Sequence, residues 1–284
     1  MTRVIDAHVH LWDLAVHPQP WTEPFPALHR SFGIEDLSTV LEEHGVDAAV
    51  VVQAGDTTGE TVDLLAIAAS SARLAGVVGW VDLAGSDVAG TLANLRSAPG
   101  GDALVGIRHQ LQVEPDPAFL GRREVRAGLA ALAAAGVTFD VVVSPSQLPL
   151  VIDTVAALPE LRFVLDHAGK PSIAGPALAL DRWRADLERL AGAPNVAVKL
   201  SGLVTEAGKG AWTQHQLDPV IDHVLSCFGP PRVMAGSDWP VCLLAASYGQ
   251  VQSTLSSALD ALNPRGRADV LGGTALAWYP RAVP

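Results

Sequence analysis

Eight short runs of apolar residues recur along the chain, and glycine, proline or a helix-capping residue bounds each of them. The runs are rich in Val, Ile and Leu and lack a regular polar alternation, as expected for strands covered on both faces of a parallel sheet. The predicted strands span residues 4–8, 48–53, 74–81, 104–110, 138–143, 162–167, 196–200 and 232–235.

Stretches with helical periodicity alternate with these runs. They span residues 34–44, 60–73, 88–96, 122–135, 147–158, 177–190, 216–227 and 248–262. Several precede a glycine, the residue preferred at a helix C-cap. The Gly-x-Gly-x-x-Gly signature of a doubly wound open sheet does not follow the first strand. The alternation therefore predicts an α/β protein, a closed (β/α)8 TIM barrel, with residues 1–284 as a single domain.

Two long loops interrupt this regularity. Residues 11–33 are rich in proline and aromatic side chains without being helical. The sequence leaves three interpretations of this segment open: a lid or wall over the barrel mouth, a packing loop, or an oligomer contact. Residues 201–213, which contain Glu206, Lys209 and Trp212, are a second candidate wall of the same mouth.

Composition narrows the class of protein further. The 284 residues are 49% hydrophobic and 17% charged, which suits a large buried core. The apolar stretches are far shorter than the roughly 20 residues of a membrane span, and no secretory signal is evident, so we expect a cytoplasmic protein with no membrane partner. A net charge of −11 disfavours nucleic acid. Cys227 and Cys242 are too few for a disulfide scaffold, and the sequence is compatible with a homo-oligomer.

Charged and titratable side chains gather at the far ends of four predicted strands. Active sites of barrel enzymes are built there, and the first and last strands are neighbours in a closed barrel, so these side chains should share one mouth. They are His8 and His10 of the first strand, Arg108 and His109 of the fourth, His167 of the sixth and Asp238 after the eighth. Lys199 stands inside the seventh strand, where a lysine usually pairs with a carboxylate.

Six strings of residues carry a resemblance that spans nearly the whole chain. The first strand reads D-x-H-x-H, the sixth ends in a histidine and the eighth is followed by an aspartate, a pattern that resembles the amidohydrolase superfamily. More narrowly, the sequence is similar to sugar lactonases such as L-fuconolactone and L-rhamnonolactone hydrolases, and to 2-pyrone-4,6-dicarboxylate lactonase. The strings lie at residues 5–13, 106–108, 165–171, 198–203, 236–241 and 272–275.

One departure from the superfamily pattern concerns a metal. Metal-dependent members usually add a ligand from the fifth strand, typically histidine, whereas residues 139–144 contain none. A zinc ion held by His8, His10 and Asp238, with His167 nearby, would have three protein ligands. The resemblance also implies that the lactonase branch can work without a metal. We therefore expect no required cofactor, with a single divalent ion such as zinc as the alternative.

The resemblance implies hydrolysis of a small lactone. Such a reaction needs a base for water and stabilisation of the carbonyl oxygen. We expect Asp238 to take the proton from water, and His8, His10 and His167 to polarise the carbonyl group. The expected substrate-binding residues are Arg108, His109, Trp80, Gln53, Trp239 and Lys170.

The substrate class follows from the arginines that the sequence places at the mouth. An aromatic dicarboxylate would need more than one arginine there, and Arg108 is the one we place. This favours a neutral sugar lactone such as L-fuconolactone or L-rhamnonolactone. Two other functions stay open: a metal-dependent decarboxylase or amide hydrolase on the same barrel and, more distantly, a non-catalytic ligand-binding barrel.

Overall fold

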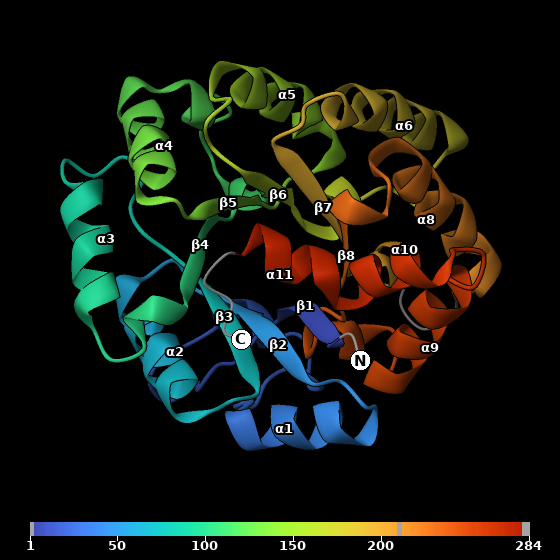
Figure 1. Cartoon of the computed structure of the whole chain (residues 1–284), viewed down its shortest axis with the longest axis horizontal. Helices are drawn as coiled ribbons and strands as arrows, with labels where there is room; N and C mark the ends of the chain where they lie inside the picture. The colour runs from blue at the N-terminus through green and yellow to red at the C-terminus, as the bar shows by residue number, and fades with distance from the viewer. Residues whose placement is uncertain (1–2, 209–211, 280–284) are drawn as a thin grey trace.

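Eight parallel strands form the centre of the molecule, in the order of the chain. The computed structural model describes residues 3–208 and 212–279, and Lys209 of the second long loop lies outside them. Each strand pairs with the next through a parallel register, and Figure 1 shows helices surrounding the strands. The strands are β1 (Ile5–Val9), β2 (Ala48–Val52), β3 (Leu74–Gly79), β4 (Leu104–His109), β5 (Thr138–Val141), β6 (Phe163–Leu165), β7 (Val196–Leu200) and β8 (Val233–Ala235).

The first and last strands meet just beyond the carboxyl end of β8. The backbone N–H of Asp238 donates to the carbonyl of His8 at 2.9 Å, and that of His10 donates to the carbonyl of Trp239 at 2.7 Å. The buried Asp6 carboxylate bridges the same two strands, because its Oδ1 accepts from the backbone N–H of His8 and of Ser237. These bonds close the predicted (β/α)8 barrel.

The main helices follow the strands in the predicted alternation. They are α1 (Ile34–Glu43), α2 (Thr58–Ser70), α3 (Val88–Ser97), α4 (Arg123–Ala135), α5 (Leu148–Ala157), α6 (Ala177–Ala191), α8 (Gln214–Phe228) and α9 (Tyr248–Ala258). Three short helices were not predicted, because each is only one turn or slightly longer: α7 (Leu203–Glu206), α10 (Pro264–Ala268) and α11 (Thr274–Trp278). Within the described residues, no helix is long and apolar enough to cross a membrane.

Two apolar clusters hold the barrel together. The larger one packs the helices against the outer faces of the strands, and the smaller one contains inward-facing residues such as Val50, Val105 and Met234. Ala275 and Tyr279, at and after α11, belong to the smaller cluster. Since α11 crosses in front of the strands in Figure 1, the C-terminal segment closes the amino-terminal end of the barrel.

Three predicted strands run two residues too long at their carboxyl ends. Those of β3, β5 and β6 were placed at residues 81, 143 and 167, but the strands end at Gly79, Val141 and Leu165. After β6 the chain enters a tight turn in which His167 and Ala168 have φ values of 53° and 51°. Apolar content alone does not reveal this left-handed turn, because neither residue is glycine.

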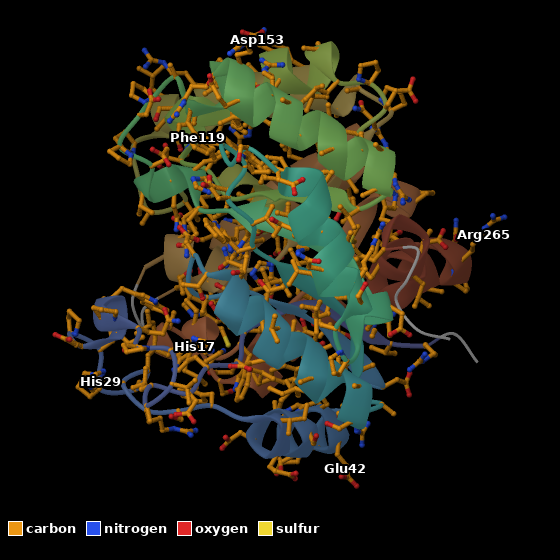
Figure 2. All side chains as sticks on the ribbon, turned by 90° about the vertical axis from the view of Figure 1, so that its left-hand side faces the viewer. His17, His29, Glu42, Phe119, Asp153 and Arg265 are labelled. Carbon is orange, nitrogen blue, oxygen red and sulfur yellow. The ribbon has the colours of Figure 1, made fainter. Side chains whose placement is uncertain are left out.

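The long segment at residues 11–33 covers the carboxyl end of the barrel. Figure 2 shows His17 and His29 of this segment on one side of the molecule and Arg265 of α10 on the opposite side. A backbone pairing between Trp12 and Phe32 ties the base of the segment together. The segment is therefore placed to shape the mouth at which the predicted site residues should meet.

Candidate active site

The two imidazoles of β1 lie side by side and are buried, 0% exposed for His8 and 5% for His10. Their Nε2 atoms are 3.2 Å apart. Nδ1 of His10 lies 2.7 Å from the carbonyl oxygen of Val52, which can only accept, so Nδ1 carries a proton. Nε2 of His10 therefore points towards His8 and the barrel mouth.

Asp238 sits beside this pair, immediately after β8. Its Oδ1 lies 3.4 Å from Nε2 of His10 and 3.7 Å from Nε2 of His8. The residue has a φ of 61°, a left-handed conformation that costs of order 1–3 kcal/mol for a residue other than glycine. A strained backbone that aims a carboxylate at two imidazoles is typical of functional sites.

His167 completes the group from the turn after β6. Its ring centre is 4.6 Å from that of His8, and its Nδ1 is 2.9 Å from the hydroxyl of Ser201. Gly202 packs directly behind it with a φ of 62°; a Cβ atom there would lie 2.7 Å from Nδ1 of His167 and 3.1 Å from Oδ2 of Asp238. The glycine is required both by its backbone conformation and by this close approach.

Arg108 reaches the same site, and both terminal nitrogen atoms of its guanidinium group already have partners. One guanidinium nitrogen lies 3.2 Å from Oδ2 of Asp166 and 3.4 Å from Nε2 of His8. The other donates to the backbone carbonyl of Gln53 and, at 3.3 Å, to the side-chain oxygen of Gln53. Gln53 is fully buried, so its amide holds Arg108 in place at the base of the site.

Three of the expected substrate-binding residues point elsewhere. His109 follows Arg108 on β4, so its side chain faces away; it pairs with Glu114 at 2.9 Å and stacks on Phe119. Trp80, whose backbone N–H donates to the Thr61 hydroxyl, does not line the cavity, and Trp239 is buried edge-to-face against Phe32. The expectation that His109, Trp80 and Trp239 contact substrate is therefore not supported by their placement.

A second set of buried charges lies beneath the histidines, and we call Asp140, Asp166, Lys199 and Tyr279 the lower layer. All four are 0% exposed. The Lys199 ammonium lies 2.6 Å from Oδ2 of Asp140 and 3.0 Å from Oδ1 of Asp166, and the Tyr279 hydroxyl donates to Asp140. The predicted pairing of Lys199 with a carboxylate is confirmed. Asp140 and Asp166 were missed, although a lone aspartate within an apolar strand was the available signal.

The lower layer contacts the site through His8. Nδ1 of His8 lies 3.3 Å from the Lys199 ammonium and 3.3 Å from Oδ1 of Asp166. Both ring nitrogens of His8 are thus held by buried polar groups, which fix the ring in place. By contrast, Nδ1 of His10 and of His167 contact the Val52 carbonyl and the Ser201 hydroxyl, and Nε2 of His10 faces His8 and Asp238 within the site.

Burial and charge set the protonation states of these groups. Burial lowers the pKa of His8 well below its ordinary value, and it lowers the pKa of His167 as well. Burial alone would raise the pKa of Asp238, but the positive charge that His167 carries when protonated and the hydrogen bond with His10 outweigh it, so that pKa is lowered. For Asp166, the opposing effects of Lys199 and His8 likewise outweigh burial and lower the pKa strongly.

A cavity of about 500 Å³ opens above these side chains. His10, His167, Arg108 and Asp238 form its base, and Lys170 contributes to its side. The long segment after β1 supplies another part of the wall, so the lid-or-wall interpretation fits its position better than a packing loop does. The wall residues from this segment are Pro18, Gln19, Pro20 and Trp21.

The donor set at the base also fits a divalent metal ion. Nε2 of His8, Nε2 of His10 and Oδ1 of Asp238 are mutually 3.2, 3.4 and 3.7 Å apart. Tetrahedral zinc with bonds of about 2.0–2.2 Å places its ligands about 3.3–3.6 Å apart. The outward Nδ1 atoms contact Asp166 and the Val52 carbonyl, as is typical of metal-ligating histidines.

The barrel and this group of side chains define a class: barrel proteins that gather histidines from β1 and β6 and an aspartate after β8 around one cavity. A family model described as Amidohydrolase matches residues 5–281. The chain belongs to this family, as its sequence strings indicate.

Individual relatives are similar over their full length. L-fucono-1,5-lactonase from Burkholderia multivorans is 40% identical and covers 99% of this chain and 97% of that protein. L-fucono-1,5-lactonase from Burkholderia ambifaria is 37% identical, covering 98% and 96%. The crystal structure of an amidohydrolase from Burkholderia multivorans with bound zinc has a TM-score of 0.92 at 40% identity, covering 98% and 99%.

Proposed function

We propose that this protein is a lactonase, a hydrolase that opens the ester bond of a neutral sugar lactone such as L-fucono-1,5-lactone or L-rhamnonolactone. The observation that carries the proposal is the Asp238 carboxylate beside three buried imidazoles at the base of a cavity of about 500 Å³. Full-length similarity to two L-fucono-1,5-lactonases supports the same reaction.

Asp238 acts as the general base in this proposal. Its lowered pKa keeps the carboxylate ionised at neutral pH, and it lines the cavity where water and substrate meet. As the water oxygen bonds to the lactone carbonyl carbon, Asp238 takes one proton from that water. The ring C–O bond then breaks and Asp238 returns the proton to the departing alkoxide, so a hydroxy acid forms and the enzyme is regenerated.

His167 stabilises the negative charge that develops on the carbonyl oxygen, and His10 orients the base. His167 is neutral because of its lowered pKa, and its Nε2–H is available when Nδ1 accepts from the Ser201 hydroxyl, whereas the single N–H of neutral His8 is directed to Asp166. His10 donates through Nδ1 to the Val52 carbonyl, which orients its Nε2 towards Oδ1 of Asp238, 3.4 Å away, so His10 helps to position the base. Preorganised donors in a buried site are worth about 10²–10³ in rate per donor.

A metal ion at this site would be held by His8, His10 and Asp238, with His167 nearby. When bound, it would supply Lewis-acid polarisation and lower the pKa of a water ligand. We propose that turnover does not require a metal ion. Strand β5 contains no histidine that could add a ligand, and its carboxylate, Asp140, is already paired with Lys199 and Tyr279. The side chains present already supply a base and an N–H donor.

The remaining cavity groups suit hydroxyl-bearing substrates. Gln110 and Lys170 line the cavity, and Trp21 of the long segment is 41% exposed and offers an apolar ring face. Amide and charged groups can hydrogen-bond sugar hydroxyls, whereas an indole can cover the apolar side of the ring. Arg108 and Gln53 support the base of the site rather than contacting substrate freely.

A lactone panel read with a pH indicator tests the proposal. We expect acid release from L-fucono-1,5-lactone or L-rhamnonolactone well above the uncatalysed rate. We expect no turnover of aromatic acids. Rates measured after exhaustive chelation, with metal content quantified, address the cofactor. Activity that is lost on chelation and restored only by a divalent ion would contradict metal independence. If the protein hydrolyses none of the lactones in the panel, the proposed lactonase function is wrong.

A further inference from the structure

The charged side chains that line the proposed substrate cavity differ in whether a partner already neutralises them. Among the described residues, its cations other than histidine are Arg108 and Lys170, and its carboxylates are Asp56 and Asp238. Whether the cavity accepts an anionic substrate depends on how many of these charges are already neutralised by partners outside the cavity. The two cations differ from the two carboxylates in this respect.

Both terminal nitrogen atoms of Arg108 already have oxygen partners, and its Nε is buried. Its guanidinium group contacts the Asp166 carboxylate and two oxygen atoms of Gln53, and the residue is 4% exposed. A carboxylate that entered the cavity would have to compete with Asp166 for the same nitrogen atoms. That exchange is unfavourable, because it leaves a buried aspartate with one fewer partner.

Lys170 is the more exposed of the two cavity cations, and Glu206 pairs with it. Lys170 follows the His167 turn with a φ of 54°, and its ammonium lies 2.6 Å from Oε1 of Glu206, the last residue of α7. The two side chains are 28% and 22% exposed, so solvent screens the pair only in part. Glu206 itself does not line the cavity as the described residues define it.

The carboxylates, by contrast, face the cavity. Oδ1 of Asp238 lies at the base of the cavity, 3.4 Å from Nε2 of His10 and 3.7 Å from Nε2 of His8. Asp56 is exposed at the rim and accepts a hydrogen bond from the neutral amide of Gln53. A ligand carboxylate would therefore meet like charge without a free cation to offset it, whereas a neutral lactone pays no such penalty.

We propose that Glu206 is a specificity-determining residue, which by pairing with Lys170 excludes lactones that carry a carboxylate from the cavity. The inference rests on the proposed lactonase function and names the substrate class that it rejects. Glu206 acts through Lys170 and is not a catalytic residue. Lys170 lines the cavity three residues after His167, so the pair places its charges at the proposed site through Lys170.

Three substrates of similar size separate charge from shape. One is L-fucono-1,5-lactone, which carries an exocyclic methyl group. The second has the same ring with a neutral hydroxymethyl group in that place, and the third has a carboxylate there. The measured quantity is the ratio of kcat/KM for the carboxylate lactone to kcat/KM for the hydroxymethyl lactone, so that effects on folding or on the chemical step cancel.

Glu206→Gln keeps the shape and the hydrogen bond to Lys170 but removes the charge. We expect this variant to raise the ratio by about tenfold, and we expect the gain to shrink as salt concentration rises. Adding Lys170→Met should abolish the gain. Asp260→Asn, which breaks an exposed pair with Arg267 and changes net charge equally, should leave the ratio unchanged.

The outcomes distinguish the two proposals. If the wild-type protein hydrolyses the neutral lactones but Glu206→Gln leaves the ratio unchanged, the specificity proposal is wrong and the lactonase proposal stands. An equal rise in the Asp260→Asn control, or a rise that survives Lys170→Met, also contradicts a role for this pair. If the wild-type protein hydrolyses none of the three lactones, the proposed function fails first.

Discussion

The polar residues at the centre of this barrel form two layers that differ in how completely their charges are paired. The upper layer consists of His8, His10, His167 and Asp238; the last three line the cavity, and Nε2 of His8 lies 3.2 Å from Nε2 of His10. The lower layer lies beneath it, and there each charge touches a partner of opposite sign. A site that must change protonation state thus rests on a set of charges whose state is fixed.

The difference shows what each layer contributes to function. Asp238 faces uncharged His8 and His167, so it can accept a proton and return it. Asp140 and Asp166 share the ammonium of Lys199 in a fully buried environment, where separating the charges is costly. The upper layer therefore takes part in the reaction, and the lower layer holds the upper layer in position and stabilises the fold.

Removing the base should give the largest effect. Asp238→Asn keeps the size of the side chain but cannot take a proton, so we expect kcat/KM for L-fucono-1,5-lactone to fall by about 10³-fold or more. The free energy of unfolding should change far less. Steady-state kinetics and urea unfolding on the same preparation measure both.

Asp56→Asn is the matched control, because Asp56 lines the same cavity but is exposed at its rim. Its effect on kcat should stay within about tenfold, since it has no role in proton transfer in our proposal. Comparable losses in the two variants would show that cavity charge, rather than base catalysis, explains the result.

Breaking the lower layer should affect stability more than chemistry. Lys199→Met leaves Asp140 and Asp166 buried without their shared cation, and removing one partner of a buried pair typically costs about 3–5 kcal/mol of unfolding free energy. Urea unfolding measures the loss. Lys170→Met, which breaks a partly exposed pair with Glu206, should cost less than about 1 kcal/mol.

A stable Lys199→Met variant would contradict this division between the layers. A variant that keeps wild-type stability but loses most of its activity would place Lys199 in the catalytic machinery instead. The contact between Lys199 and Nδ1 of His8 makes a secondary loss of activity expected, and it should be smaller than that of Asp238→Asn.

Sequence patterns predicted the upper layer because its residues stand at the ends of apolar runs. Given a closed barrel, the ends of parallel strands meet, so His8, His10, His167 and Asp238 could be brought together without knowing any distance. The order of the eight strands followed from the same alternation. What the pattern could not supply was the left-handed backbone at His167 and Asp238, which depends on tertiary contacts.

The lower layer was harder to predict because burial hides its partners. Lys199 on β7 was expected to have a carboxylate neighbour, but the sequence does not show that Asp140 on β5 and Asp166 just after β6 converge on it from the neighbouring strands. The error over His109 has a simpler cause. Neighbouring residues on a strand point to opposite faces, so Arg108 and His109 could not both face the cavity.

The pH dependence of activity and that of stability should also differ between the two layers, and we expect this difference to be smaller than the effects of the substitutions. His8 and His167 have a lowered pKa, so kcat/KM should be constant from neutral pH down to below the ordinary histidine value of about 6.5 and then fall as these rings protonate and tie Asp238 in ion pairs. Asp166 has a depressed pKa, so its contribution to stability is present above its unfolded value and is lost only as pH falls towards the lower folded value. Activity should therefore decline at a higher pH than the folded state does, as monitored by kinetics and circular dichroism on one sample. Coincident transitions would contradict the separation, because they would mean that the same groups govern both.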